Sequence, residues 1–330
     1  MNATPSPNDL GTLAAPRTLA VTLGDPRGIG PEICIAAARA VRTTLPHLSL
    51  LMTGASGTGA ESEADEFISV GEWRAGGDAM LAGRLAGLAI ETATRLALEG
   101  RVRGIVTGPI DKAALNAGGY AYPGHTEMLA ALSGVADVSM LMCAERTSLG
   151  GPLRVVLATT HVPLAAVPRL VSADLLIRQT QMLASALRTG WDIEHPVIAL
   201  CALNPHASDG GLFGDEEARI FEPAIARLRS EGVDARGPYP ADTVFLRAAR
   251  REFDAVVAPY HDVGMAAFKT AAFGSGVNVT LGLPFVRTSP DHGTALDIAG
   301  RGVADAGSMI EAMELANRLV ARSAAAASRP

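Results

Sequence analysis

Short apolar runs alternate with helical patterns along most of this chain, and this alternation constrains the fold more than any other feature. Helical periodicity appears between the runs, notably at Leu81–Glu99, Ser172–Arg188, Glu216–Glu231 and Ala304–Arg322, and glycines follow the first three of these segments. The runs lie at Leu19–Leu23, Leu48–Met52, Gly104–Val106, Val138–Met142, Leu153–Ala158, Val197–Ala202, Ala255–Ala258 and Val277–Leu281. Strands that alternate with helices predict an α/β fold.

The length and composition predict two folded domains. The chain has 330 residues, of which 48% are hydrophobic, and this supplies enough apolar side chains for two cores. Residues 1–17 contain no apolar segment of the kind found in signal peptides, so we expect a disordered tail there. The polar, glycine-rich segment Gly54–Gly77 predicts a long surface excursion.

The charges and cysteines narrow the possible functions. The net charge is −6 and no basic run occurs, which argues against a nucleic-acid or anionic membrane surface. No segment is apolar for long enough to span a membrane. Cys34, Cys143 and Cys201 lie within apolar segments and share no metal-ligand spacing. We therefore expect buried, reduced thiols in a cytoplasmic protein.

The stretch TLGDPRGIGPEI, from Thr22 to Ile33, joins a predicted strand to a predicted helix. A dinucleotide fingerprint needs a third glycine, but Pro31, Glu32 and Ile33 follow Gly30, and an acid stands where a pyrophosphate needs free N–H groups. Pro31 suits the first helical position and Glu32 the positive end of the helix dipole. A tight turn before a capped helix is therefore the alternative interpretation, and the stretch fits a classical Rossmann motif poorly.

Three histidines follow predicted strands. His161 ends LRVVLATTH, His206 ends VIALCALNPH and His261 ends DAVVAPYH. In open α/β sheets, ligands bind at the carboxyl ends of the strands. One such histidine is often only a turn or core residue, but three in the same topological position favour a catalytic divalent-metal site. Asp242 and Asp262 could bind the metal or orient its ligands.

Polar residues near these histidines favour anion binding. The GHTE segment contains His125 and Thr126, and Lys269, Asn278 and Arg287 follow His261. These are the hydrogen-bond donors expected around a phosphate or carboxylate, although Lys269 and Arg287 could each be an ordinary surface charge. The segment DHGTALDIAGRGVADA, from Asp291 to Ala306, could hold an adenosine and its ribose hydroxyls.

Several blocks of sequence, in a fixed order, carry a family resemblance from about Leu19 onward. They are TLGDPRGIGPEI, VTGPIDKAAL, GHTEML, TTHVPL, LNPHASDGGLFGDEE, PADTVF, YHD and GVNVTLGLPFVRTSPDHGTALDIAGRG. In this order they resemble the 4-hydroxythreonine-4-phosphate dehydrogenases of vitamin B6 biosynthesis. The first and last blocks also resemble stretches of isocitrate and isopropylmalate dehydrogenases, whose NAD-binding fold is not a classical Rossmann fold.

The resemblance implies an architecture. It implies two α/β/α domains around a cleft, like those of isocitrate and isopropylmalate dehydrogenases. The cofactor-side domain would comprise residues 18–125 and 270–330, and a central domain of residues 126–269 would carry the metal ligands and the dimer interface. The family forms homodimers with the active site at the subunit interface, so we expect the partner subunit to complete each site.

The resemblance also implies roles for particular residues. It places a divalent metal, zinc, magnesium or cobalt, on His161, His206 and His261. It makes Lys269 and Asp242 the catalytic candidates. The substrate would contact His125, Thr126, Lys269, Asn278 and Arg287. The cofactor, NAD with NADP possible, would contact Asn278, Asp291, His292, Gly293, Thr294 and Asp297.

The implied reaction is NAD- and metal-dependent oxidation of 4-phosphooxy-L-threonine at C3, followed by decarboxylation to 3-amino-2-oxopropyl phosphate. Related enzymes act on 4-phospho-D-threonate or erythronate, or on a dihydrodiol dicarboxylate, and remain alternatives. Phosphate acyltransferases share a similar two-domain architecture, but acyl transfer needs no three-histidine metal site. The chain departs from the family pattern at Val263, Ala266 and Ala267, where glutamine and proline are usual, and at Asp111, where asparagine is usual.

Overall fold

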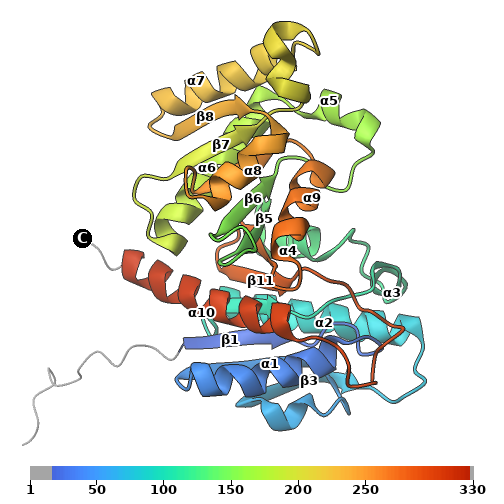
Figure 1. The fold of residues 1–330 in the computed structure, drawn as a ribbon. Helices are drawn as coiled ribbons and strands as arrows, with labels where there is room; N and C mark the ends of the chain where they lie inside the picture. Colours follow the sequence, from blue (N-terminus) through green and yellow to red (C-terminus); the bar gives the residue numbers. More distant parts are fainter. Residues whose placement is uncertain (1–16, 328–330) are drawn as a thin grey trace, which may run out of the picture.

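The computed structural model describes residues 17–327, which form a mixed α/β fold around one sheet of eleven strands (Figure 1). The strands are β1 (Arg17–Thr22), β2 (Leu48–Ser56), β3 (Glu66–Glu72), β4 (Gly104–Thr107), β5 (Ser139–Ala144), β6 (Leu153–Leu157), β7 (Val197–Cys201), β8 (Asp234–Tyr239), β9 (Ala255–Ala258), β10 (Val277–Leu281) and β11 (Val286–Pro290). The α-helices are α1 (Gly30–Thr44), α2 (Ala79–Leu98), α3 (Lys112–Ala117), α4 (His125–Ser133), α5 (Val167–Leu170), α6 (Ala173–Trp191), α7 (Glu222–Ser230), α8 (Ala241–Ala249), α9 (His261–Ala272) and α10 (Gly307–Ala327). Shorter helical turns are η1 (Ala60–Glu63), η2 (Leu164–Ala166), η3 (Pro205–Gly211) and η4 (Glu217–Phe221).

The strand order confirms an α/β fold that is not a classical Rossmann fold. The order is β3-β2-β1-β4-β11-β10-β5-β6-β9-β7-β8. Both ends of the sheet are parallel, but β10 runs antiparallel to β11 and β5, and β5 runs antiparallel to β6. A classical Rossmann sheet is mostly parallel with the order 3-2-1-4-5-6. The predicted division into two domains falls between β10 and β5, which pair directly, and it stays a prediction.

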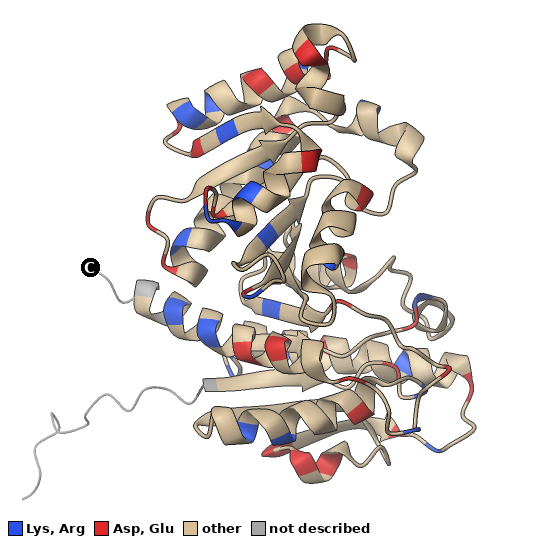
Figure 2. Ribbon diagram, viewed as in Figure 1, with Lys and Arg blue, Asp and Glu red and all other residues tan. Residues whose placement is uncertain are grey.

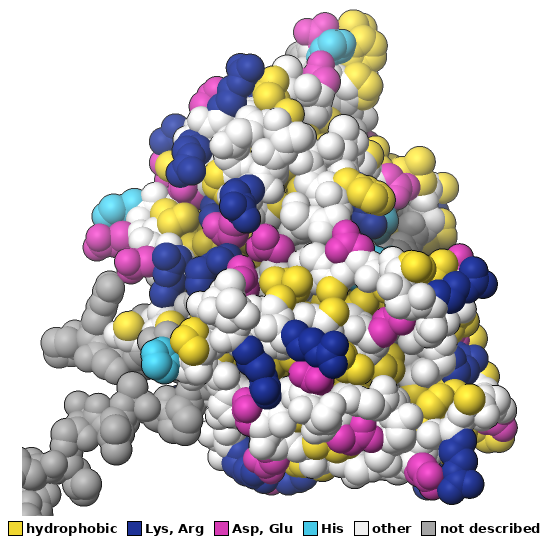
Figure 3. Space-filling model, turned by 60° about the horizontal axis from the view of Figure 1, so that its bottom comes forward, with side chains coloured by type: hydrophobic (Ala, Val, Ile, Leu, Met, Phe, Trp, Pro, Cys, Tyr) yellow, Lys and Arg dark blue, Asp and Glu magenta, His cyan; other side chains and the backbone are white. Residues whose placement is uncertain are grey.

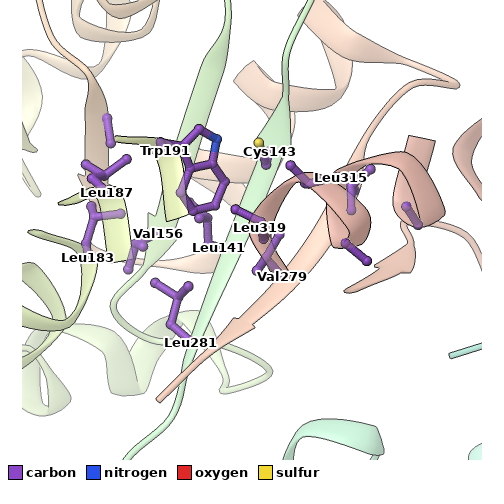
Figure 4. Packing of buried hydrophobic residues seen from close by; sticks show 14 of the residues in the cluster. Leu141, Cys143, Val156, Leu183, Leu187, Trp191, Val279, Leu281, Leu315 and Leu319 are labelled. Carbon is purple, nitrogen blue, oxygen red and sulfur yellow. The ribbon is translucent and has the colours of Figure 1, made fainter. Parts of the chain in front are cut away.

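A hydrophobic core lies between the middle of the sheet and two helices (Figure 4). Trp191 and its neighbours on α6 pack with Leu315 and Leu319 of α10 against the central strands. The strand residues at this contact are Leu141 and Cys143 of β5, Val156 of β6, and Val279 and Leu281 of β10. Each such side chain contributes about 1.5–3 kcal/mol when fully buried. The core therefore holds the antiparallel centre of the sheet, from which several cavity residues project.

Three sequence predictions can be compared directly with the fold. The cysteines are buried and unpaired, as predicted, while the cytoplasmic location stays a prediction. Residues 1–16 of the predicted tail lie outside the described residues, and Arg17 already begins β1. The prediction of a long surface excursion at Gly54–Gly77 was wrong, because this segment contains the end of β2, η1 and all of β3, which pairs in parallel with β2. As a half-exposed edge strand, β3 lacks the continuous apolar run of a central strand.

Charged residues of both signs are distributed over the helices and loops, as Figure 2 shows. On the face drawn in Figure 3, basic and acidic side chains are interspersed, so neither sign dominates that face. Across residues 17–327, none of the helices combines the length and the apolar character required to cross a membrane.

The glycines after β1 serve close packing at the start of α1. A Cβ on Gly28 would lie 2.6 Å from the carbonyl oxygen of Thr294, the same oxygen that accepts a 2.9 Å hydrogen bond from the N–H of Ile29. A Cβ on Gly30 would collide with the carbonyl oxygen of Leu23. Pro31 and an acidic residue occupy the first turn of α1, as predicted. This turn therefore supports the loop that contains Thr294.

Gly28→Ala is expected to destabilise the fold by about 1–3 kcal/mol, because the added methyl group must displace backbone atoms. Thermal unfolding measures this loss, and titration with NAD measures any loss of cofactor affinity. A variant that melts normally but has lost NAD affinity selectively would contradict the packing role and restore the fingerprint interpretation.

Candidate active site

A cavity of about 670 Å³ lies where several strands of the sheet end. Its walls come from the ends of β4 and β6, the first turns of α3 and α4, helix α9, the β10–β11 pair and the loop after β11. Ten of the predicted site residues line it: His125, Thr126, His161, His261, Lys269, Asn278, Arg287, Asp291, His292 and Gly293. Segments far apart in the sequence thus converge on one cavity.

Helix α4 presents His125 and Thr126 at its first turn. The helix follows Gly124, which provides no side-chain cap, and it ends at Gly134, whose left-handed φ of 66° suits glycine. The Nε2 atom of His125 is buried without a hydrogen-bond partner. Burial lowers the pKa of His125 well below its usual value, and the nearby charges of Arg287 and Lys112 lower it further. His125 is therefore neutral at pH 7 and can bind an anion by donating one hydrogen bond.

Helix α9 carries three cavity residues on one stripe. His261, Met265 and Lys269 are spaced by four residues, which places them on neighbouring turns of the same side. Nδ1 of His261 lies 2.8 Å from a carboxylate oxygen of Asp262. Donation from Nδ1 leaves Nε2 with a free lone pair for a ligand. The Nζ atom of Lys269 donates a 3.3 Å hydrogen bond to the carbonyl oxygen of Asp291.

The imidazole rings of His161 and His261 lie close together, just after the paired parallel strands β6 and β9. Their ring centroids are 5.6 Å apart. The hydroxyl of Thr159 donates a 2.8 Å hydrogen bond to the carbonyl oxygen of Pro259, which ties the end of β6 to the segment before α9. Burial lowers the pKa of His161, and the charge of Lys112 lowers it further. The His161 imidazole can thus present a neutral nitrogen, the form that binds metals.

Arg287 is a buried cation in the wall of this cavity. In the β10–β11 pairing, it lies opposite Thr280, so both side chains stand on one face of the sheet. Its Nη1 donates to the Thr280 hydroxyl at 2.9 Å and its Nη2 to the Thr107 hydroxyl at 2.6 Å. Only 2% of Arg287 is exposed, and no ion pair with it is found within residues 17–327. Burial lowers the pKa of its guanidinium to about 10, and the negative charge of Glu127 offsets only part of this effect.

Unpaired polar atoms are concentrated at this cavity. In the described part of the chain, twelve buried side-chain nitrogen or oxygen atoms lack a hydrogen-bond partner, and six of them belong to cavity residues: His125, Ser139, Gln179, Asn278, Arg287 and His292. An unsatisfied buried polar group costs about 1–3 kcal/mol. A polar ligand in the cavity would satisfy these atoms.

Four predicted residues lie away from this cavity. His206 is exposed on η3, where its ring faces Phe213 at 6.3 Å between centroids. Asp242 lies in the first turn of α8. Thr294 and Asp297 lie further along the loop that leaves the cavity after Gly293. Within residues 17–327, no group of three His, Cys, Asp or Glu side chains could hold a metal ion, so one chain brings together two of the three predicted ligands.

The same loop also reaches a second cavity. Ala299 and Gly300 line a cavity of about 470 Å³ together with Arg27, Gly28 and Trp73. The loop Asp291–Gly300 therefore connects the main cavity with a second one beside the start of α1. Two cavities bordered by the same loop suit a ligand with two separated parts, such as a dinucleotide.

The structure also shows cavity residues that the sequence analysis did not select. Lys112, Ser139 and Gln179 line the main cavity. Lys112 could have been selected from the sequence, because it lies in the VTGPIDKAAL block that carries the family resemblance, just after β4. Ser139 and Gln179 come from a strand and a helix interior, where the sequence offers no comparable signal.

The fold is α/β, and its main cavity lies where several strands end and is lined by histidines and by the cations Lys112, Lys269 and Arg287. The profile of one family, "Pyridoxal phosphate biosynthetic protein PdxA", matches residues 31–316. The chain therefore belongs to the PdxA family of oxidoreductases.

Individual relatives agree with this assignment. The chain is 41% identical over 334 residues to a 4-hydroxythreonine-4-phosphate dehydrogenase of Erythrobacter litoralis, covering 93% of this chain and 98% of the relative. A crystal structure of the same named enzyme from Klebsiella pneumoniae has a TM-score of 0.81 and 38% identity, covering 92% of this chain and 99% of the other. An isocitrate dehydrogenase from Methylococcus capsulatus, with a TM-score of 0.54 and 18% identity over 94% and 88% of the two chains, shares the fold. The predicted family and its isocitrate dehydrogenase-like fold are thus confirmed.

Proposed function

We propose that this enzyme oxidises 4-phosphooxy-L-threonine at C3 with NAD and then releases carbon dioxide to give 3-amino-2-oxopropyl phosphate. Membership of the PdxA family supports a dehydrogenase in pyridoxal phosphate biosynthesis. The observation that most favours a phosphorylated substrate is the buried guanidinium of Arg287 in the cavity wall, which forms no ion pair within residues 17–327. A phosphate monoester carries about −1.5 to −2 charges at pH 7 and is a strong hydrogen-bond acceptor, so it would compensate this cation.

The chain's own residues would orient the substrate between two walls of the cavity. On one wall, His125, Thr126 and Arg287 would donate to its anionic groups. On the other wall, the side chain of Lys269 is 42% exposed and lines the cavity, so its ammonium could stabilise negative charge on the C3 oxygen. A phosphate contact by Lys269 is the alternative role. Asp242 remains a candidate catalytic residue from the sequence resemblance.

A nicotinamide cofactor suits the loop that connects the two cavities. The unpaired Oδ1 of Asn278 and Nε2 of His292 in the main cavity could bind polar groups of the nicotinamide half. Gly293, Thr294, Asp297 and the following glycine turn would hold the adenosine half. When bound, NAD accepts a hydride, and NADP remains possible.

A divalent metal, zinc, magnesium or cobalt, would bind His161 and His261 of one subunit, and His206 of the partner subunit would complete the set. His206 is exposed and begins a run of four non-glycine residues with positive φ, from 45° to 69°. Such backbone strain concentrates at functional sites. When bound, the metal supplies a Lewis acid for the substrate's oxygen.

Exposed apolar side chains beside the metal ligands support a homodimer. Val162, Leu164 and Leu170 follow His161 and are 40%, 63% and 46% exposed. Leu212 and Phe213 follow His206 and are 72% and 45% exposed. Large exposed apolar residues that gather near a site are typical of protein interfaces. A subunit contact made by these two segments would bring the predicted ligands of two chains together.

Leu164→Glu or Phe213→Glu is expected to weaken the homodimer by more than about tenfold, because each places a charge in an apolar contact. Sedimentation velocity at several protein concentrations measures the dissociation. Leu98→Glu is the control, since Leu98 is 50% exposed at the end of α2, away from both segments. A monomeric parent protein at assay concentrations would contradict the shared metal site.

A substrate comparison tests the proposed function. NADH formation would be followed with 4-phosphooxy-L-threonine, 4-phospho-D-threonate, 4-phospho-D-erythronate and a dihydrodiol dicarboxylate. We expect the largest kcat/KM for 4-phosphooxy-L-threonine. A larger value for one of the others would reassign the substrate within the family.

A further inference from the structure

Lys112 presents an unpaired ammonium group to the main cavity. It is the first residue of α3, which Asp111 caps by accepting a 2.7 Å hydrogen bond from the N–H of Ala114. Asp111 also lies 3.7 Å from the guanidinium of Arg27. Among residues 17–327, no carboxylate pairs with Lys112 and no acceptor receives a hydrogen bond from its ammonium. The charge of Lys112 is therefore available to a ligand.

The side chain of Lys112 lies along the residue that precedes α4. Its Cε atom would be 3.7 Å from a Cβ placed on Gly124. Lys112 lines the main cavity together with His125 and Arg287, and its positive charge lowers the pKa of His125. Arg287 acts on the same His125 imidazole. Two cations from different elements thus act on one buried histidine.

The first turn of α4 is itself open to an anion. Helix α4 has nine residues, and no side chain caps its N-terminus. Its first turn also contains Glu127, whose Oε2 would lie 3.5 Å from a Cβ placed on Gly124, so an anion bound there needs cations that outweigh this carboxylate. The free N–H groups and the dipole at such an end attract negative charge. Independently of the helix, the buried Nε2 of His125 has no partner. The helix end, the imidazole and the Lys112 side chain all face this part of the cavity.

We propose that Lys112 binds the substrate's phosphate, together with the first turn of α4 and Arg287. This assignment rests on the proposed function in taking the substrate to be phosphorylated. A phosphate carries close to two negative charges, so one guanidinium alone leaves much of that charge uncompensated. Lys269 is less available, because it bonds the carbonyl of Asp291 and lies 4.0 Å from that residue's carboxylate. Lys112 provides the second full charge.

Binding of inorganic phosphate, measured by calorimetry with the intact protein, tests the assignment without turnover. Lys112→Met is expected to raise the Kd for phosphate by about tenfold or more, since a hydrogen bond to a charged group contributes about 1.5–3 kcal/mol. Lys112→Arg is expected to stay within a few-fold of the parent. Arg146→Met, which removes a cation that is 91% exposed, controls for net charge.

Kinetics provide the second measurement. Lys112→Met is expected to raise the KM for 4-phosphooxy-L-threonine while leaving that for unphosphorylated 4-hydroxythreonine unchanged, with a normal melting temperature. Unaltered phosphate binding in Lys112→Met, or a parent protein that binds no phosphate, would overturn the assignment. Phosphate binding that depends on Lys112 in a protein that does not oxidise 4-phosphooxy-L-threonine would instead refute the proposed function alone.

Discussion

Arg287→Met is expected to weaken binding of 4-phosphooxy-L-threonine by about 30-fold to several thousand-fold. Removing one partner of a desolvated charge pair typically costs about 2–5 kcal/mol, which corresponds to that range. Equilibrium binding and the KM both measure the loss. The same variant should scarcely affect the slow reaction of unphosphorylated 4-hydroxythreonine, which has no phosphate to lose.

The melting temperature of Arg287→Met distinguishes ligand binding from a structural role. Arg287 is 2% exposed, and among the described residues its guanidinium bonds only the hydroxyls of Thr107 and Thr280. A buried charge without an ion-pair partner is unfavourable, so an apolar side chain of similar length should leave stability unchanged or raise it. An equal loss of activity on phosphorylated and unphosphorylated substrates would contradict phosphate binding by Arg287.

His206→Ala is expected to reduce turnover by at least about 100-fold, since even residues that only orient metal ligands change metal affinity or activity by about 10- to 100-fold. Treatment with a chelator should abolish turnover of the parent, and added zinc, magnesium or cobalt should restore it. Elemental analysis of each sample establishes its metal content.

His195→Ala is the matched control for that substitution. His195 is an exposed histidine between α6 and β7, and it does not line the main cavity. We expect parental activity and metal content from this variant. Full activity in a metal-free sample would contradict the metal assignment. Equal activity and metal content in His206→Ala and His195→Ala would also contradict it.

Long apolar strands could be predicted from the sequence, whereas edge and hairpin strands could not. All eight predicted runs are strands, because each is buried on both faces and contains few polar residues. The missed strands β8, with sequence DARGPY, and β11, with sequence VRTSP, contain proline, arginine or glycine. They form because β7 and β10 offer strand edges to pair with, although the β7–β8 register shifts between Ala199 and Cys201. Tertiary pairing therefore overrides local preference in both.

The site residues were predictable where they follow strands. His161 and His261 follow the parallel strands β6 and β9, and their ring centroids are 5.6 Å apart. Because parallel strands end at the same edge of a sheet, this closeness was predictable. Burial of Arg287 depends on the pairing of β10 with β11, so the sequence alone could not separate it from a surface charge. A single chain does not bring His206 to the main cavity. We propose that this contact forms between subunits, so the sequence of one chain could not place it.

The most direct test of the account is the stoichiometry of the complete reaction. The dimer with divalent metal would be incubated with NAD and 4-phosphooxy-L-threonine, and NADH and carbon dioxide would be quantified together. Equal amounts of NADH and carbon dioxide, with 3-amino-2-oxopropyl phosphate as the product, are the predicted result. NADH without carbon dioxide, or no NADH from a protein shown to contain metal, would contradict it.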